Sequence, residues 1–308
     1  MRRIPLIIAA LIAILAIPAA AQAATVGISD QQAGTFTNPL YKPLNMRVAR
    51  YITPYDVMSN PQQRATLDAW LTAARGANQK VLVSFEHSYA PSKARKLPSI
   101  SAYTKEMKKF KKAYPYVHEI SPWNEVNRCQ RTINGSVQGQ PTCKSPKRVA
   151  QYYMAARKVF TKRTIVGIDI LDEQNVNRTV KYLKSFLRYA KPRPKVIGFH
   201  NYSDTNRFST TRTKRVLAAF PGKVWLTETG GIVKLGNSFS FSITRASKAL
   251  GCMFTLAKTN ERIQRLYVYQ FNGAPEGADF DAGLINIDGT KRPGYTVVQN
   301  REARACKK

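Results

Sequence analysis

The sequence has 308 residues, of which 49 are Lys or Arg and 18 are Asp or Glu, so its formal net charge is +31. A chain of this length can bury a full hydrophobic core, and the absence of linkers, low-complexity tracts and solenoid repeats excludes repeat and disordered classes in favour of one large α/β domain or two small ones. The charge indicates either solvated helix faces or attraction to an acidic polymer; nucleic acid is the weaker partner because no basic run is joined to a nucleic-acid motif.

The first 23 residues have the pattern of a signal peptide. Arg2 and Arg3 precede a nearly uniform apolar run from Ile4 to Ile17, and Ala21-Gln22-Ala23 has small residues where a signal peptidase reads. The apolar run is shorter than the ~20 residues that a membrane-spanning helix needs. We therefore expect cleavage after Ala23, a secreted protein without a stable membrane anchor, and a mature domain over 24–308.

Eight short apolar or β-branched runs predict strands along the mature chain, with starts that advance by about thirty residues on average. They are Thr25–Ser29, Met46–Thr53, Val81–Glu86, Glu119–Trp123, Thr164–Ile170, Val196–His200, Val224–Thr227 and Leu266–Phe271.

Helix signals lie between most of these strands. Asn60-Pro61 and Ser145-Pro146 each offer an N-cap residue followed by proline at the first helical position, and apolar residues at helical spacing follow both. The same spacing recurs over 180–187 and 243–257. Alternating strands and helices predict a parallel sheet, and eight units in ~250 residues match a single-domain (β/α)8 TIM barrel. An open doubly wound sheet is the alternative, but it usually has a glycine-rich loop after the first strand, where Gly27 stands alone.

The four cysteines predict disulfides, because an even number in a secreted chain favours pairing. Three pairings are possible. Cys129 and Cys143 flank one glycine-containing loop, so we expect them to bond to each other. Cys252 and Cys306 would then tie the C-terminal tail to the domain. No spacing resembles a zinc site.

Two glutamates stand out in a chain that has few acidic residues. Glu125 follows the fourth predicted strand and Glu228 ends the seventh, and sites in such barrels form at the C-terminal ends of the strands. An unpaired carboxyl in a low-dielectric mouth has a raised pKa. Glycosidic bond cleavage requires one protonated and one ionised carboxyl. The structural alternative is that each glutamate only caps the helix that follows it.

The motifs around these glutamates resemble clan A, the retaining glycoside hydrolases that place their acid/base on strand four and their nucleophile on strand seven. The resemblance covers essentially the whole mature chain, and its overall character is similar to compact Asl1-like glycosyl hydrolases of the endo-β-1,3-glucanase type. One departure is that the clan commonly has tryptophan near the end of strand eight as a sugar platform. The residues concerned are Arg50, Trp123-Asn124-Glu125, His200-Asn201-Tyr202, Thr227-Glu228-Thr229-Gly230 and, at the departure, Tyr269-Gln270-Phe271.

The resemblance implies roles for the two carboxyls. Glu228 would be the nucleophile, kept ionised by Arg50 and by a hydrogen bond from Tyr202. Glu125 would be the protonated acid and later the base that activates water. We expect Glu125 to have fewer compensating charges around it than Glu228 has.

The remaining candidates concern substrate binding. Asn124 would hydrogen-bond the sugar 2-hydroxyl, and His200 either lines a subsite or is a satisfied barrel histidine. No cofactor is expected, and a metal site built from His87, His200 and Asp204 has no recognised spacing. A poly- or oligosaccharide is the expected substrate. The rival functions are an inactive barrel that binds carbohydrate or acidic wall polymer, a basic polyanion-binding protein, and a transglycosylase that uses the same carboxylates.

Overall fold

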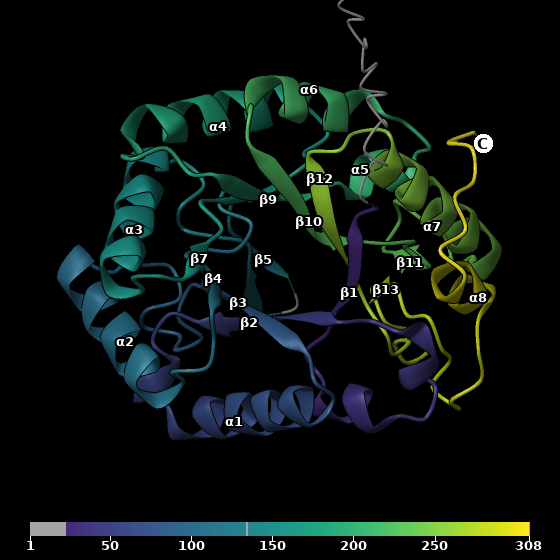
Figure 1. The fold of residues 1–308 in the computed structure, drawn as a ribbon, viewed down its shortest axis with the longest axis horizontal. Helices are drawn as coiled ribbons and strands as arrows, with labels where there is room; N and C mark the ends of the chain where they lie inside the picture. The colour runs from purple at the N-terminus through teal and green to yellow at the C-terminus, as the bar shows by residue number, and fades with distance from the viewer. Residues whose placement is uncertain (1–22, 134, 308) are drawn as a thin grey trace, which may run out of the picture.

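A closed ring of parallel strands lies at the centre of the computed structural model, which describes residues 23–133 and 135–307. The strand order is β7-β4-β3-β2-β1-β12-β10-β9-β8, and helices surround the strands on the outside (Figure 1). The strands are β1 (Thr25–Ser29), β2 (Val48–Pro54), β3 (Lys80–Glu86), β4 (Glu119–Ser121), β7 (Thr164–Ile165), β8 (Asp169–Leu171), β9 (Val196–His200), β10 (Lys223–Thr229) and β12 (Ile263–Val268).

The ring closes because β7 and β8 are successive parts of one barrel strand. Between them, Val166 N donates to Ile120 O at 2.8 Å on one side, and Gly167 N donates to Val196 O at 2.9 Å on the other. The same stretch of chain therefore bonds both neighbours, and the barrel has eight strand positions. The predicted (β/α)8 fold is confirmed.

Helices follow most of the strands and cover the outside of the barrel. In α1 the Asn60 side chain accepts a hydrogen bond from Gln63 N at 3.0 Å, as expected for the N-cap. Ser145 makes no such bond, so Pro146 at the first position of α3 marks that start alone. The helices are α1 (Pro61–Gly76), α2 (Ile100–Ala113), α3 (Pro146–Val159), α4 (Val176–Tyr189), α5 (Tyr202–Asn206), α6 (Thr211–Ala219), α7 (Ile243–Lys258) and α8 (Pro293–Gln299).

Two short antiparallel pairs of strands lie outside the barrel. One pairs β5 (Arg131–Ile133) with β6 (Ser136–Gln138), and the other pairs β11 (Lys234–Leu235) with β13 (Phe280–Asp281). The first pair lies within the cysteine-flanked loop.

The eighth predicted strand was placed too late in the chain. The strand ends at Val268 rather than Phe271. After it, Gln270 N donates to Ala282 O at 3.2 Å and Phe271 N donates to the Asp30 carboxylate at 2.9 Å. These bonds turn the backbone away from the barrel ladder, which the apolar pattern alone did not reveal.

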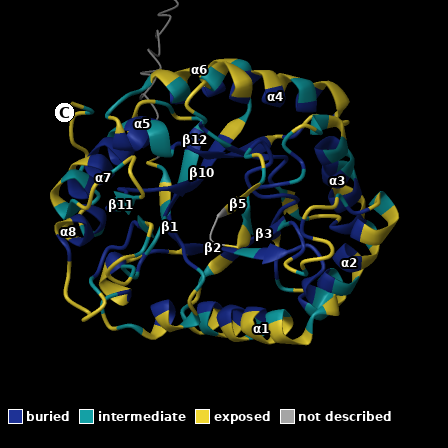
Figure 2. Cartoon of the chain, turned by 180° about the vertical axis from the view of Figure 1, so that it is seen from behind, coloured by how far each residue is buried: buried dark blue, intermediate teal, exposed yellow. Residues whose placement is uncertain are grey.

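The hydrophobic core lies mainly between the strands and the helices. The helices turn their buried sides to the barrel and their exposed sides outward (Figure 2). Trp123 is fully buried and stacks on Tyr152, with ring centroids 4.9 Å apart, so it packs the core and is no exposed sugar platform. A smaller cluster fills the barrel interior near the strand starts, formed by Val48, Leu82, Val166, Val196, Trp225 and Tyr267.

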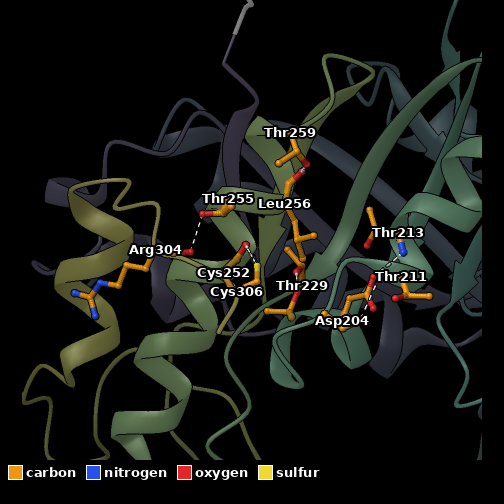
Figure 3. Close-up of a disulfide and its surroundings, with 12 residues drawn as sticks. Asp204, Thr211, Thr213, Thr229, Cys252, Thr255, Leu256, Thr259, Arg304 and Cys306 are labelled. Atoms are coloured by element: carbon orange, nitrogen blue, oxygen red, sulfur yellow. Dashed lines mark hydrogen bonds between the residues drawn. A yellow bond between two sulfur atoms is a disulfide. The ribbon is translucent and has the colours of Figure 1, made fainter. Parts of the chain in front are cut away.

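Both predicted disulfides, Cys129–Cys143 and Cys252–Cys306, are present. The second fastens the C-terminal tail along α7, where Thr255 Oγ1 also donates to Arg304 O at 2.7 Å (Figure 3). A Cβ at Gly251 would lie 2.6 Å from the Arg304 side chain. Glycine therefore permits the tail to cross the helix this closely.

The predicted signal peptide covers residues 1–23. Residues 1–22 lie outside the described residues, which begin at Ala23. Among the residues from 23 to 307 that are described, no helix is both long and apolar enough to cross a bilayer.

The tail disulfide predicts a measurable loss of stability in the double variant Cys252→Ser, Cys306→Ser. Its sequence separation of 54 residues corresponds to about 4 kcal/mol in the chain-entropy account. Urea unfolding should show a loss of that order, with an unchanged far-ultraviolet circular dichroism spectrum. Unaltered unfolding free energy would mean that the tail contributes nothing to the folded domain.

Candidate active site

Arg50 lies at the centre of a polar layer inside the barrel, and its side chain is fully buried. Nη1 donates to Glu228 Oε2 at 2.8 Å, and Nη2 donates to Asn124 Oδ1 at 2.7 Å and to Asp169 Oδ2 at 3.1 Å. One arginine on β2 therefore contacts residues from or just after β4, β8 and β10. This arrangement gathers four of the barrel strands around a single guanidinium.

Asp169 is the buried counterion of this arginine, and the sequence analysis missed it. Oδ2 also accepts hydrogen bonds from Ser84 Oγ at 3.1 Å and Ser121 Oγ at 3.0 Å, while Thr227 Oγ1 donates to Oδ1. Burial alone would raise the pKa of Asp169, but the Arg50 charge, the His200 imidazole and the Thr227 hydroxyl hold it below its usual range. An acidic residue inside an otherwise apolar predicted strand was the signal that could have identified it.

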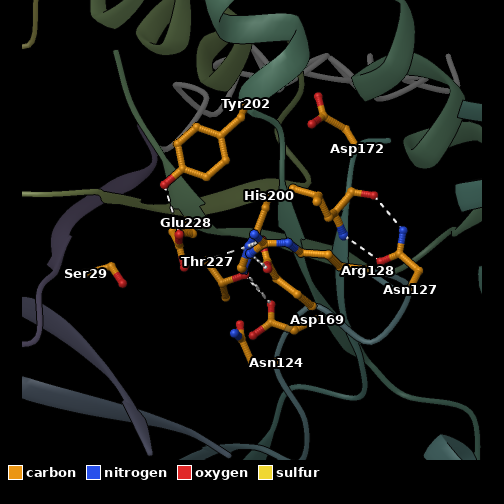
Figure 4. Close-up of polar contacts among 12 residues, drawn as sticks. Ser29, Asn124, Asn127, Arg128, Asp169, Asp172, His200, Tyr202, Thr227 and Glu228 are labelled. Carbon is orange, nitrogen blue, oxygen red and sulfur yellow. Dashed lines mark hydrogen bonds and ion pairs between the residues drawn. The ribbon is translucent and has the colours of Figure 1, made fainter. Parts of the chain in front are cut away.

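Glu228 accepts hydrogen bonds on both carboxylate oxygens. Besides the Arg50 contact on Oε2, Tyr202 OH donates to Oε1 at 3.0 Å, and the two side chains point toward one another in Figure 4. Burial and then the Glu228 charge raise the pKa of Tyr202, so the phenol keeps its proton and remains a donor. The structure thus brings the three residues together as the motif pattern implied.

Glu125 occupies a different environment from the one expected. Arg128 Nη1 lies 2.8 Å from Oε2, and His200 Nδ1 lies 3.3 Å from Oε1. Burial alone would raise the pKa of Glu125, but the Arg128 and His200 charges lower it to about 2. The expectation that Glu125 has fewer compensating charges around it than Glu228 is therefore wrong, because Arg128, three residues along the chain, pairs with it.

The two candidate carboxylates face the same point at the C-terminal mouth of the barrel. One oxygen of Glu125, one oxygen of Glu228 and a ring nitrogen of His200 all lie within 4.8 Å of one another. Glu125 adopts a positive φ of 39°. Flanking bonds hold this conformation, since Asn124 N donates to Phe85 O at 2.6 Å and Arg128 N to Glu125 O at 2.9 Å.

Asn124 is held at both ends of its amide. Its Oδ1 accepts from Arg50, and its Nδ2 donates to Glu86 Oε2 at 3.2 Å. Glu86 in turn accepts from Gln140 Nε2 at 2.8 Å and Tyr89 OH at 2.6 Å. These contacts orient the Asn124 amide at the mouth, and they place Glu86 beside the site.

The three residues considered for a metal site do not assemble. His87 Nδ1 lies 2.8 Å from Ser88 O, and the Asp204 carboxylate accepts from Arg212 N and Thr213 N at 3.2 and 2.6 Å. Only His200 of the trio belongs to the cluster that contains both glutamates, and the sole grouping of potential metal ligands within the described chain is this cluster.

His200 lies among the charged groups of the site, and its Nε2 is 3.4 Å from Arg50 Nη2. It is fully buried and lies near three carboxylates, Glu125, Asp169 and Glu228, which face the two arginines Arg50 and Arg128. Burial alone would lower the pKa of His200, but these carboxylates raise it to about 9. A protonated imidazole gives the five charged groups and the histidine a net charge of zero.

The imidazole should therefore titrate near pH 9, and the chain has only three histidines to distinguish in a nitrogen-15 NMR titration. Because the folded pKa lies above the ordinary 6.5, the stabilisation from His200 is fully present below about pH 6.5 and is lost as the pH rises through about 9. Thermal midpoints should fall over that window. A His200 resonance that titrates near pH 6.5 would contradict the charge assignment.

Comparison with solved structures shows the same fold in several glycosidases. A GH5_18 protein from Streptomyces cattleya, in complex with GlcNAc, shares 12% identity with a TM-score of 0.67 over 91% of this chain and 80% of its own. A GH10 protein from Paenibacillus barcinonensis shares 13% identity with a TM-score of 0.64 over 90% and 94%. The native xylanase 10B from Thermotoga maritima shares 13% identity with a TM-score of 0.61 over 89% and 93%.

The sequence itself connects the chain to one family. No curated protein matches it. Residues 122–293, which include Glu125, His200, Tyr202 and Glu228, match the family described as glycosyl hydrolase catalytic core. With the barrel and the paired carboxylates at its mouth, the chain belongs to the glycosyl hydrolase catalytic core family.

Proposed function

We propose that the protein hydrolyses glycosidic bonds of a polysaccharide with retention of configuration, through a covalent glycosyl-enzyme. The supporting observation is that one oxygen each of Glu125 and Glu228 lie within 4.8 Å of each other. Retaining enzymes hold their carboxyls about 5–5.5 Å apart, whereas inverting enzymes leave ~6.5–9.5 Å for a water molecule. This spacing favours direct attack by one carboxylate.

Glu228 is the proposed nucleophile, since Arg50 and Tyr202 orient both of its oxygens. In the first step, Glu228 attacks the anomeric carbon as the bond to the leaving oxygen breaks, and Glu125 supplies the proton to that oxygen. In the second step, Glu125 takes a proton from water, whose oxygen displaces Glu228.

The proton on Glu125 has a nearby source. His200 Nδ1 lies 3.3 Å from Glu125 Oε1, and the carboxylates around His200 favour its protonated form. Transfer from Nδ1 to Oε1 converts an imidazolium–carboxylate pair into a neutral imidazole and a neutral acid. With Arg128 in contact with Glu125, the surrounding charges favour the imidazolium–carboxylate pair, so this transfer needs the guanidinium to move away from Oε2.

Two further side chains are proposed to bind the sugar. The fixed Asn124 amide is positioned for the 2-hydroxyl, a contact that strengthens in the transition state. Tyr269 follows β12 and is half-buried, and burial and then the charge of Glu228 raise its pKa. We propose Tyr269 as the sugar floor, in the place where the clan commonly has tryptophan.

We also propose that the protein acts outside the cell. The signal-peptide pattern of residues 1–23 supports this proposal, as do two disulfides, because such bonds persist mainly in oxidising compartments. Detection of the mature chain beginning at Ala24 in culture medium would test it.

The nucleophile assignment predicts that Glu228→Gln abolishes turnover. Purified wild type should release reducing ends from at least one polymer in a panel of glucans, xylans and mannans, and the variant should release none while keeping its thermal midpoint. Glu261→Gln is the matched control, because Glu261 is an exposed acidic residue. Near-normal activity of Glu228→Gln would refute the assignment; an inactive wild type that binds acidic polymer would favour the binding-protein alternative.

The acid/base assignment predicts a different behaviour for Glu125→Ala. Hydrolysis of substrates with poor leaving groups should fall by about 10²–10⁴-fold, and activated aryl glycosides should be affected less because they need no proton. Added azide should restore part of the rate and form a glycosyl azide of retained configuration. An azide product of inverted configuration, or equal losses on both kinds of substrate, would contradict the role.

A further inference from the structure

The arginine beside Glu125 has no part in the two steps described above. Arg128 Nη1 lies 2.8 Å from Glu125 Oε2, and the arginine side chain is 35% exposed while that of Glu125 is 10% exposed. The guanidinium thus lies at the boundary between the buried carboxylate and the open mouth. Its position calls for an explanation, because it holds the acid/base in the charged form.

The backbone of Arg128 is fixed, whereas its side chain is long and partly solvated. Arg128 N donates to Glu125 O at 2.9 Å, and Gln140 N donates to Arg128 O at 2.7 Å. The next residue, Cys129, is bonded to Cys143. Rotation of the Arg128 side chain can therefore separate the guanidinium from Glu125 without movement of this backbone.

Catalysis requires that separation. A guanidinium 2.8 Å from Glu125 Oε2 favours the charged carboxylate, whereas the first step needs the protonated acid. Neutral sugar hydroxyls offer weak compensation to a guanidinium that leaves a carboxylate. Another carboxylate offers an equivalent partner, since it can accept two parallel hydrogen bonds from the planar fork.

The chemistry of the reaction defines where that partner would lie. Glu125 gives its proton to the leaving oxygen. Arg128, in contact with Glu125 Oε2, therefore borders the sugar on the leaving-group side. Resting on the proposed hydrolase function, we propose that Arg128 is a specificity-determining residue that binds the carboxylate of a uronic acid unit on the leaving-group side of the cleaved bond. The exchange of partners frees Glu125 to take the proton from His200 Nδ1.

The distribution of charge over the molecule suits such a substrate. Of the 18 acidic residues, only four are exposed. The barrel buries most of the others, while lysines and arginines dominate the outer faces of the helices. A surface of one sign attracts polyanions and increases their local concentration at the mouth. The four exposed acidic residues are Glu261, Glu276, Asp279 and Asp288.

A matched pair of substrates tests the proposal. Neutral β-linked glucans and mannans would each be compared with the same polymer after part of its primary hydroxyls has been oxidised to carboxylates. The wild type should show kcat/KM at least about tenfold higher on the oxidised polymer, as expected for a charge-assisted contact. Mass spectrometry of the products should find uronic acid at the newly formed non-reducing ends far above its average in the polymer.

Arg128→Gln should lose both the kcat/KM preference and the end-group enrichment, and Arg128→Lys should retain part of each. The pH profile of Arg128→Gln should also change. Removal of the ion pair raises the pKa of Glu125, so the alkaline limb of the profile should move to higher pH. Arg131→Gln is the matched control, because it removes the same charge from an exposed position in the same loop. This control should keep the enrichment.

The outcomes separate the two proposals. Wild-type cleavage with unbiased end groups, or an Arg128→Gln variant that keeps the enrichment, would overturn the role of Arg128 while leaving the hydrolase function intact. A preference that Arg131→Gln abolishes as fully as Arg128→Gln would reduce the effect to general surface charge and would also overturn it. A wild type that cleaves neither polymer of any pair would overturn the role of Arg128, and one that also cleaves no polymer of the glucan, xylan and mannan panel would overturn both proposals.

Discussion

The buried pair between Arg50 and Asp169 is the interaction on which the site depends. Both side chains are fully buried, with the two atoms 3.1 Å apart, and an isolated charge at that depth would cost several kcal/mol. The pair is sustained because Asp169 also accepts from hydroxyls on β3, β4 and β10, while Arg50 reaches Asn124 and Glu228. The same network that satisfies these charges therefore fixes the register of the residues at the mouth.

Periodicity and local motifs in the sequence predict much of the fold. Most strand positions, the N-cap at Asn60 and the Cys129–Cys143 disulfide follow from patterns within short stretches of chain and agree with the structure, and Cys252–Cys306 follows as the remaining pair. The surroundings of Glu125 could not be predicted in this way. In the sequence Arg128 is one of many basic residues, and only the folded loop places it against the carboxylate. Asp169 was missed for a related reason: an acid within a strand identifies its partner only when the barrel closes.

The two glutamates differ in how their surroundings are built. The partners of Glu228 are Arg50, which is fully buried and bonded to other groups of the barrel, and Tyr202 at the start of α5, which is half-buried. Glu125 is paired instead with a partly exposed arginine and a histidine whose charge depends on the neighbouring carboxylates. A rigid environment suits a nucleophile that must keep its orientation, whereas an exchangeable one suits a group that must change its protonation state during the reaction.

The burial of most acidic residues has a consequence beyond the site. With few exposed carboxylates, the surface offers little counter-charge of its own, so contact with an anionic matrix releases small cations from the matrix and anions from the protein. This entropic gain weakens as salt increases. The distance over which the protein spreads through such a matrix should accordingly be set by ionic strength, with slow migration and repeated rebinding in dilute surroundings and free diffusion in salty ones.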